Sequence, residues 1–265
     1  MHFPVTRRVP QVPLPDRWNS VTASESIERL LSTIENTWSL SPETARVLAA
    51  MVVEGCRSNV LEFGAGVSSQ ILAQAVAESG GGTLDSLEEN PTWCGDAWRE
   101  VERIGTVTAR LITAKIGLTV DRRGVYFRYT EPAHLSPKVQ YDLVLIDAPW
   151  GRYGRDGALH LALPHLAVGG LIVLDDAARI REQRTLRRWL NRYAGLELIA
   201  NDWSIGRGVA VLLKTRDDRE ESPGAFLVAE IWVSGVYELL RYGRGIIRHN
   251  ARLKARTPSS MTQAG

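Results

Sequence analysis

The sequence predicts an α/β protein with a seven-stranded, mostly parallel sheet, helices on both faces, and an antiparallel last strand. Two observations predict this class. From residue 58 to residue 214, short apolar runs alternate with stretches of helical periodicity, an order typical of parallel sheets with crossover helices. Some runs, such as 141–147, are continuously apolar instead of alternating, which is typical of strands covered by helices on both faces.

The first elements precede this alternating region. Residues 1–20 are rich in proline and predict an extended arm rather than a folded element. An apolar stripe at helical spacing follows Ser24 and predicts a first helix. The sequence Ser41-Pro42-Glu43 then combines a capping residue, a proline and an acid, which predicts the start of a second helix that ends at Gly55.

Strands and helices then alternate along the chain. We expect strands near residues 58–63, 83–88, 106–112, 141–147, 169–175, 196–202 and 208–214. We expect helices near residues 67–79, 91–103, 156–166 and 179–193. The last two strands are separated by a short glycine-containing turn, so they should pair antiparallel. Within an extra segment, 115–130, the alternating residues 125–129 predict a short edge strand.

The most informative stretch, residues 59–70, has the pattern of a strand, a tight turn and the start of a helix. Gly64 and Gly66 allow the backbone to turn sharply and to approach a ligand closely. The free N–H groups at the start of the following helix face the same place. Glu62 adds an anionic acceptor just before the turn. An ordinary glycine turn is the alternative, because Ser69 stands where the dinucleotide-binding fingerprint has a third glycine.

Acids follow three of the predicted strands. Glu88 lies at about the distance from the glycine turn at which Rossmann-type folds present an acid to ribose hydroxyls. A carboxylate can accept two hydrogen bonds from a vicinal diol, so this spacing has a chemical reason, and a solvated strand end is the alternative. Two later strands end in Asp147 and in the Asp175-Asp176 pair. In open α/β sheets, ligands bind at this carboxyl edge.

With these features, the chain resembles the class I S-adenosylmethionine-dependent methyltransferases over roughly residues 38–214. Residues 62–66 are similar to the first motif of that family, and Glu88 matches the acid that holds the cofactor ribose. The later strand ends resemble those of the small-molecule O-methyltransferase branch, which includes catechol and macrocin O-methyltransferases. The resemblance implies a Rossmann-like fold that binds S-adenosylmethionine through Ser41, Glu62, Gly64, Ala65, Gly66, Ser68, Ser69, Glu88, Glu89 and Asp147.

The three strand-end aspartates, Asp147, Asp175 and Asp176, match metal ligands in the resembling branch. Three converging carboxylates suit Mg²⁺, which would lower the pKa of an acceptor hydroxyl and orient it. The alternative is that Asp147 contacts cofactor or substrate while Asp175 or Asp176 caps the following helix. The catechol enzymes carry a lysine base three residues after the first ligand, and Trp150 stands at that position here.

Methyl transfer needs alignment of two reactants and, for a hydroxyl, removal of a proton. Asp147 and His134, which lies in a loop between prolines, are the candidate bases. Trp150, Tyr153 and Trp203 approach the same edge and are candidates for the wall of a substrate pocket, with ordinary packing as the alternative. We therefore expect a methyltransferase that acts on a small molecule, at a hydroxyl in preference to a nitrogen.

Composition narrows the partners of the protein. The formal net charge of +2 gives no signal for nucleic acid, and two cysteines do not suggest a disulfide framework. We find neither a signal-peptide stretch nor an apolar run long enough to span a membrane, and we expect a cytoplasmic protein. An NAD-dependent oxidoreductase is disfavoured by Ser69, and aminopropyl transfer by the lack of a paired acidic motif for polyamines.

The chain is expected to divide into the arm (1–20), the methyltransferase domain with its N-terminal helices (21–215), and a C-terminal extension (216–265). The extension combines an apolar helix after Pro223 with a basic tail. We expect the helix to pack on the domain or on a second copy in a homodimer, and contact with a membrane surface is the alternative. A non-catalytic binding or membrane-associated protein of the same fold is a further alternative, and this extension is the only feature of the sequence that supports it.

Overall fold

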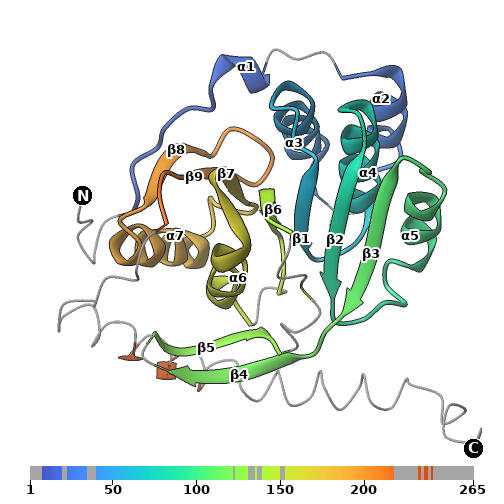
Figure 1. Ribbon diagram of the computed structural model, residues 1–265. Helices are drawn as coiled ribbons and strands as arrows, with labels where there is room; N and C mark the ends of the chain where they lie inside the picture. Colours follow the sequence, from blue (N-terminus) through green and yellow to red (C-terminus); the bar gives the residue numbers. More distant parts are fainter. Residues whose placement is uncertain are drawn as a thin grey trace, which may run out of the picture.

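The structure is a computed structural model (Figure 1). It describes residues 8–19, 23–34, 40–121, 123–130, 135, 139–149, 153–217, 232, 233, 236, 237 and 240. Within these residues, a seven-stranded sheet lies between helices, and a two-stranded sheet stands apart from it. The predicted α/β Rossmann-like class is confirmed.

The seven-stranded sheet follows the predicted strands closely. Its members are β1 (Asn59–Phe63), β2 (Gly82–Glu88), β3 (Val107–Thr113), β6 (Tyr141–Ile146), β7 (Leu166–Leu174), β8 (Leu196–Asp202) and β9 (Val209–Lys214). They are arranged in the order β3-β2-β1-β6-β7-β9-β8. The last strand, β9, pairs antiparallel with both of its neighbours, and the other pairings are parallel, as expected.

The strand order reverses between β1 and β6. From β1, the chain adds β2 and β3 on one side, and then returns to place β6 and β7 on the other side. Such a switch point opens a crevice at the carboxyl ends of the two central strands, where open α/β folds bind their ligands. Phe63 and Ile146 lie next to each other at these ends, so the glycine turn and Asp147 leave the sheet side by side.

Helices cover both faces of the sheet. They are α1 (Asp16–Asn19), α2 (Glu25–Leu31), α3 (Pro42–Glu54), α4 (Val67–Glu78), α5 (Gly95–Glu102), α6 (Asp156–Ala162) and α7 (Ile180–Arg192), and a short 3₁₀ turn at Leu163–His165 follows α6. Side chains that alternate along each strand feed two separate hydrophobic cores. One core joins the sheet to α3, α4 and α5, and the other joins it to α6 and α7.

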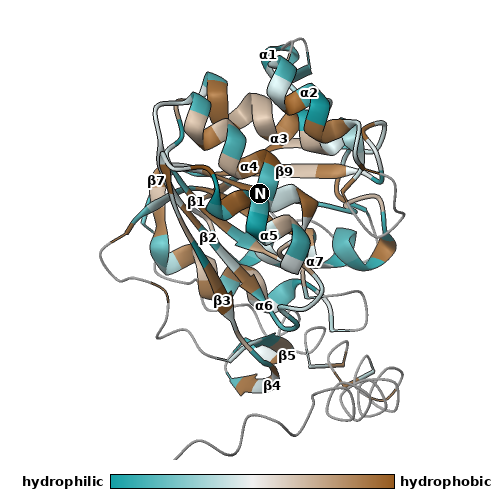
Figure 2. Cartoon of the chain, turned by 90° about the vertical axis from the view of Figure 1, so that its right-hand side faces the viewer, coloured by the Kyte–Doolittle hydropathy of each residue, from teal (hydrophilic) through white to brown (hydrophobic). Residues whose placement is uncertain are grey.

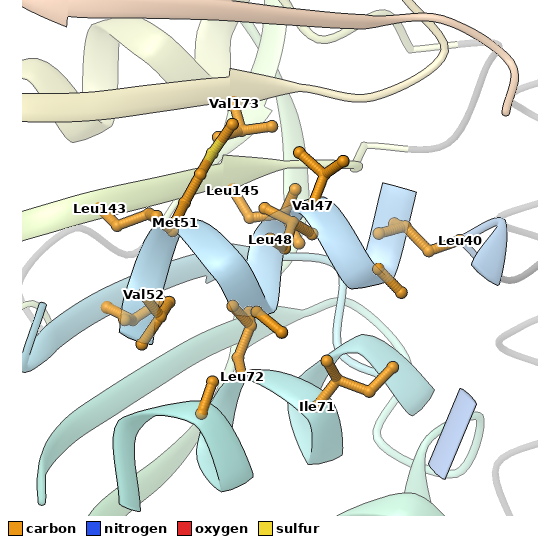
Figure 3. Packing of buried hydrophobic residues seen from close by; sticks show 14 of the residues in the cluster. Leu40, Val47, Leu48, Met51, Val52, Ile71, Leu72, Leu143, Leu145 and Val173 are labelled. Atoms are coloured by element: carbon orange, nitrogen blue, oxygen red, sulfur yellow. The ribbon is translucent and has the colours of Figure 1, made fainter. Parts of the chain in front are cut away.

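Helix α3 shows how the first core is built. Leu48 and Met51 of α3 are almost fully buried between the strands and α4. Figure 3 shows them next to Leu143 and Leu145 of β6, with Leu72 of α4 on the other side. Burying such side chains contributes about 1.5–3 kcal/mol each, so this packing holds the start of α3 and the carboxyl edge of the sheet in one rigid unit.

The extra segment forms a hairpin instead of an edge strand. Residues 125–129 pair with the preceding stretch, so that β4 (Ile116–Asp121) and β5 (Gly124–Tyr129) make a separate antiparallel pair. Figures 1 and 2 both place this hairpin beyond the carboxyl end of β3, outside the main sheet. Tyr126 and Tyr129 of β5 are buried, so the hairpin packs on the body of the protein at its ligand-binding edge.

The N-terminal arm is more structured than its prolines suggested. Val12 pairs with Asn201 of β8, and the backbone N–H of Leu14 donates to the Asp202 carboxylate at 3.0 Å. Residues 16–19 form α1, which buries Trp18. The expectation of an arm without a folded element is therefore wrong for this stretch. The non-proline residues Val12 and Leu14 supply the N–H groups, and the intervening prolines fit an edge position.

The C-terminal extension lies mostly outside the described residues. The described ones, which are helical and expose large apolar side chains, are Trp232, Val233, Val236, Tyr237 and Leu240. Of the helices that are described, none combines the length and the apolar character that crossing a bilayer requires.

Candidate active site

The turn between β1 and α4 contains Gly64 and Gly66, and each position favours glycine for a different structural reason. Gly64 has a φ of +100°, and a Cβ atom there would lie 2.9 Å from the Cβ of Ala148. Its N–H donates to the carbonyl of Leu87 at 2.9 Å, which joins the turn to β2. Gly66 has an extended backbone, and a Cβ there would meet no protein atom within 4 Å. Gly64 thus serves the turn itself, whereas Gly66 faces an open cradle of the kind that a cofactor fills.

Glu62 lies beneath this turn rather than on its ligand side. It is fully buried, and its carboxylate accepts hydrogen bonds of 2.5–2.6 Å from the hydroxyls of Ser68, Ser69 and Ser86. The Ser69 hydroxyl in turn accepts from the N–H of Gly66. Burial raises the pKa of Glu62 to about 7, against the three hydroxyls that lower it.

These contacts give Glu62 and the two serines a structural role, because their polar atoms bond to each other and hold the turn in shape. The physical reason is that Glu62 points to the face of the sheet covered by α4, where the positive end of the helix stabilises a carboxylate. The part of these three residues in cofactor binding stays a prediction.

Glu88 lies at the end of β2 beside the turn and is mostly buried. Its carboxylate accepts from the N–H of Asn90 at 2.9 Å. Burial raises the pKa of Glu88 to about 7, Glu89 raises it further, and backbone N–H groups including that of Ala65 lower it. Burial also raises the pKa of Glu89. Glu88 therefore meets the geometric condition for an acid that receives the ribose hydroxyls of a nucleoside cofactor at the turn.

We expect the affinity for S-adenosylmethionine to fall as the pH falls from 8 to 6. Only the ionised form of Glu88 accepts two hydrogen bonds from a diol, and its protonation below pH 7 competes with binding by up to about tenfold per pH unit. Isothermal titration across this range checks the slope. Glu88→Gln should bind more weakly, by about 1.5–3 kcal/mol, and lose the slope, whereas Glu62→Gln should keep it. A flat profile for the wild-type protein would contradict the assignment.

The strand-end aspartates come together as expected. We call Asp147, Asp175 and Asp176 the acid cluster, and one carboxylate oxygen from each lies within 4.8 Å of the others. Asp175 and Asp176 are buried, whereas the Asp147 side chain is 19% exposed. Burial raises the pKa of Asp147 to about 7, which Arg155 opposes and the other two aspartates reinforce. Asp176 has a φ of +56°, a conformation that aspartate tolerates better than most residues.

Three arginines surround the acid cluster, and the sequence interpretation missed them. We call Arg155, Arg179 and Arg207 the arginine clamp. Nη2 of Arg155 donates to Asp147 and to Asp176, at 2.6 Å in both cases. Arg179 and Arg207 pair with Asp176 at 2.8 Å and 2.7 Å. The N-cap residue of α7 is Arg179, and in the described part of the chain no N–H of the first turn of α7 donates to the side chain of Asp175 or Asp176.

The fit of Mg²⁺ to this site can be judged from these contacts. Asp175 Oδ1 is buried without a hydrogen-bond partner among the described residues, which a cation would satisfy. Against this, the guanidinium of Arg155 already bridges two of the three carboxylates, and the clamp supplies one positive charge for each acid. A divalent ion would therefore add two uncompensated charges. With Arg155 in place, the residues do not fit a metal.

The other predicted site residues vary in their surroundings. The Ser41 hydroxyl caps α3 by accepting from the N–H of Thr44 at 3.2 Å, and it lies against Gly206 at the carboxyl edge. Tyr153 is buried and packs edge-on against Phe127 of the hairpin, at 5.3 Å between ring centroids. His134 and Trp150, two of the predicted residues, lie outside the described part of the chain.

Trp203 contacts the N-terminal arm. Its indole N–H donates to Asn201 at 3.2 Å, and the guanidinium of Arg8 lies 5.1 Å from its ring centroid. Asn201 in turn holds the carbonyls of Val9 and Pro10. These contacts account for Trp203 without an acceptor molecule. Sequence reasoning also missed Tyr129, a buried tyrosine of the hairpin whose pKa is raised by burial and then by Glu88.

The switch point, the open space at Gly66 and the acid at the end of β2 are features of a Rossmann-like fold that binds a nucleoside cofactor. Residues 61–177 match a family profile described as a methyltransferase domain. Residues 61–177 are therefore a methyltransferase domain, and the protein is an enzyme of the methyltransferase class. No curated protein matches the sequence.

Solved structures of methyltransferases share the fold at low sequence identity. A methyltransferase from Geobacter sulfurreducens is 15% identical, with a TM-score of 0.53 over 74% of this chain and 92% of that chain. Cofactor-bound Rv0187 from MTB is 19% identical, with a TM-score of 0.51 over 72% and 89%. The O-methyltransferase TomG from Streptomyces achromogenes, in complex with SAM, is 18% identical, with a TM-score of 0.50 over 76% and 98%. At these identities, the likeness shows the fold alone.

Proposed function

We propose that this protein transfers the methyl group of S-adenosylmethionine to a hydroxyl group of a small molecule. One observation carries the proposal. The N–H groups of Asp147 and Ala148 both donate to the carbonyl of Phe63, at 3.1 Å and 2.9 Å. Phe63 directly precedes the glycine turn. The backbone that lines the cofactor cradle is therefore hydrogen-bonded to the backbone of Asp147, whose carboxylate is the most exposed of the acid cluster. This arrangement suits a donor and an acceptor that must meet in line.

The cofactor half of the site follows from the residues of the turn and of β2. The backbone at Gly64, Ala65 and Gly66 lines the cradle, with the first N–H groups of α4 facing it. Glu88 receives the ribose hydroxyls, and Glu89 lies next to it. When bound, S-adenosylmethionine supplies an electrophilic methyl group on a sulfonium. The protein's task is then to exclude water and to hold an acceptor atom against that methyl.

Asp147 is the proposed base for the acceptor. It is the member of the acid cluster that reaches the surface, while Asp175 and Asp176 are closed off by the arginine clamp. A hydroxyl that donates to the Asp147 carboxylate gains nucleophilic character as its proton is taken. Tyr153 is proposed to wall the acceptor site through its packing with the hairpin. A hydroxyl acceptor also agrees with the O-methyltransferase name of TomG, a structure of similar fold.

The test is methyl transfer from labelled S-adenosylmethionine to matched pairs of small molecules that carry either a hydroxyl or an amine at the same position. We expect label in the hydroxyl members, with a rate that rises with pH as Asp147 ionises. Labelling of the amine members alone would turn the proposal into N-methylation. S-adenosylmethionine binding without transfer to either series would count against a small-molecule acceptor.

A further inference from the structure

We propose that Arg155 takes the place of a divalent metal ion in the acid cluster, so that this enzyme handles its acceptor without a metal. The inference deepens the proposed function and rests on it for its catalytic meaning. The structural part of the inference can be tested without measuring turnover, because it states which group fills the space among the three carboxylates.

The position of Arg155 is the first argument. Nη2 lies 2.6 Å from Asp147 Oδ1 and 2.6 Å from Asp176 Oδ2, between the two strand ends. A metal bound by these same two oxygens would need to sit close to Nη2, because each oxygen would have to lie about 2.0–2.1 Å from a Mg²⁺ ion. The guanidinium and the ion are therefore mutually exclusive at this place.

Charge is the second argument. The acids that face one another in the described chain are the cluster and Glu182, which is buried beside Arg155. The arginines that face them are the clamp and Arg181. Four carboxyl groups thus meet four guanidinium groups, so every carboxyl group that is ionised already faces a positive charge. Buried charges are tolerated when they are paired and hydrogen-bonded, and two further positive charges would have no partner.

The third argument is that Arg155 cannot easily swing away. Its side chain is 4% exposed, and its Nη1 donates to the backbone carbonyl of Asp175 as well. The residue stands directly before α6, whose core side chains Ala158 and Leu159 are fully buried. Moving the guanidinium out would require the start of this helix to move, and Asp147 would lose its hydrogen-bonded arginine, whereas Asp176 would keep Arg179 and Arg207.

The chemical consequence is a fixed cation in place of an exchangeable one. Guanidinium stays charged at every physiological pH, and it presents planar N–H donors that hold carboxylates in defined directions. Arg155 thereby orients Asp147 toward the acceptor. We assign it the role of a positioning residue, which acts by holding the Asp147 carboxylate.

The first experiment measures Mn²⁺ binding to the full chain, after treatment with EDTA and removal of the chelator. The electron paramagnetic resonance signal of free Mn²⁺ reports what remains unbound. We expect no stoichiometric binding by the wild-type protein with Mn²⁺ in excess. A wild-type protein that binds one Mn²⁺, and loses it in Asp175→Asn, would overturn the inference.

The second experiment removes the guanidinium. Arg155→Ala should bind Mn²⁺ at least about 100-fold more tightly than the wild type, because a unit charge a few ångströms away changes the affinity of a divalent ion by more than this factor. Arg155→Lys keeps the charge and should bind none. Arg103→Ala, at an exposed arginine of the same kind, is the matched control and should behave as the wild type.

Circular dichroism shows whether Arg155→Ala folds. If it folds and still binds no Mn²⁺, Arg155 is not what excludes the metal, and the inference fails. If it does not fold, the wild-type titration decides by itself. Neither measurement needs a methyl acceptor, so a protein that excludes Mn²⁺ but transfers no methyl group would count against the proposed function alone.

Discussion

Gly66→Val is expected to abolish the binding of S-adenosylmethionine while leaving the protein folded. The backbone of Gly66 is extended, which valine adopts readily, and a Cβ there meets no protein atom within 4 Å. The side chain would instead occupy the proposed cofactor cradle. Isothermal titration should detect no binding, and the free energy of unfolding without ligand should change by no more than about 1 kcal/mol.

Two matched glycines make this result specific. Gly64→Val should lower the free energy of unfolding by at least the strain of about 1–3 kcal/mol for an unfavourable φ, which is +100° here. The contact of the new Cβ with Ala148 adds to this loss. Gly105→Val, where a Cβ also meets open space, should change neither stability nor affinity by much. Wild-type affinity in Gly66→Val would show that the open space is not the cofactor site.

Asp147→Asn is expected to lower kcat by about 10²–10⁴-fold, the range over which a positioned base contributes to proton transfer. Asparagine has nearly the same shape as aspartate but does not accept the proton. The affinity for S-adenosylmethionine should change little, because the turn and Glu88 are untouched. Single-turnover methyl transfer and isothermal titration, on the acceptor that the paired compounds identify, measure the two effects separately.

Asp96→Asn, at an exposed aspartate of α5, is the control and should be silent in both measurements. A parallel loss of cofactor affinity in Asp147→Asn would instead assign Asp147 to cofactor binding. Full turnover in Asp147→Asn would leave acceptor deprotonation to another group, such as His134.

The main sheet could be predicted from sequence because its central strands β1, β6 and β7 are mostly apolar runs that end at a glycine turn or at an acid. β1 and β6 lie within two residues of their expected limits, and the largest difference is at β7, which begins at Leu166. The convergence of the acid cluster was predictable for the same reason: parallel strands deliver their carboxyl ends to one edge.

The arginine clamp could not be predicted in the same way. A long flexible side chain selects its partner in three dimensions, and an arginine in a loop is exposed in most proteins. A weak signal existed, since an arginine follows each of three strands that end near the acid cluster: Arg155 after β6, Arg179 after β7 and Arg207 after β8. The burial of Glu62 was also hidden, because its partners Ser68, Ser69 and Ser86 come from different elements.

The carbonyl of Phe63, which accepts from both Asp147 and Ala148, has a consequence for how such an enzyme can change its substrate. In the proposed mechanism, main-chain atoms set the distance between the methyl donor and the base. Substitutions of side chains leave these atoms in place. New acceptors can therefore be accommodated by replacing residues of the hairpin, while the alignment of the reaction is inherited unchanged. The residues that select the acceptor and those that align the reaction are thus in different segments of the chain. Directed evolution for new acceptors should leave β1 and β6 unchanged.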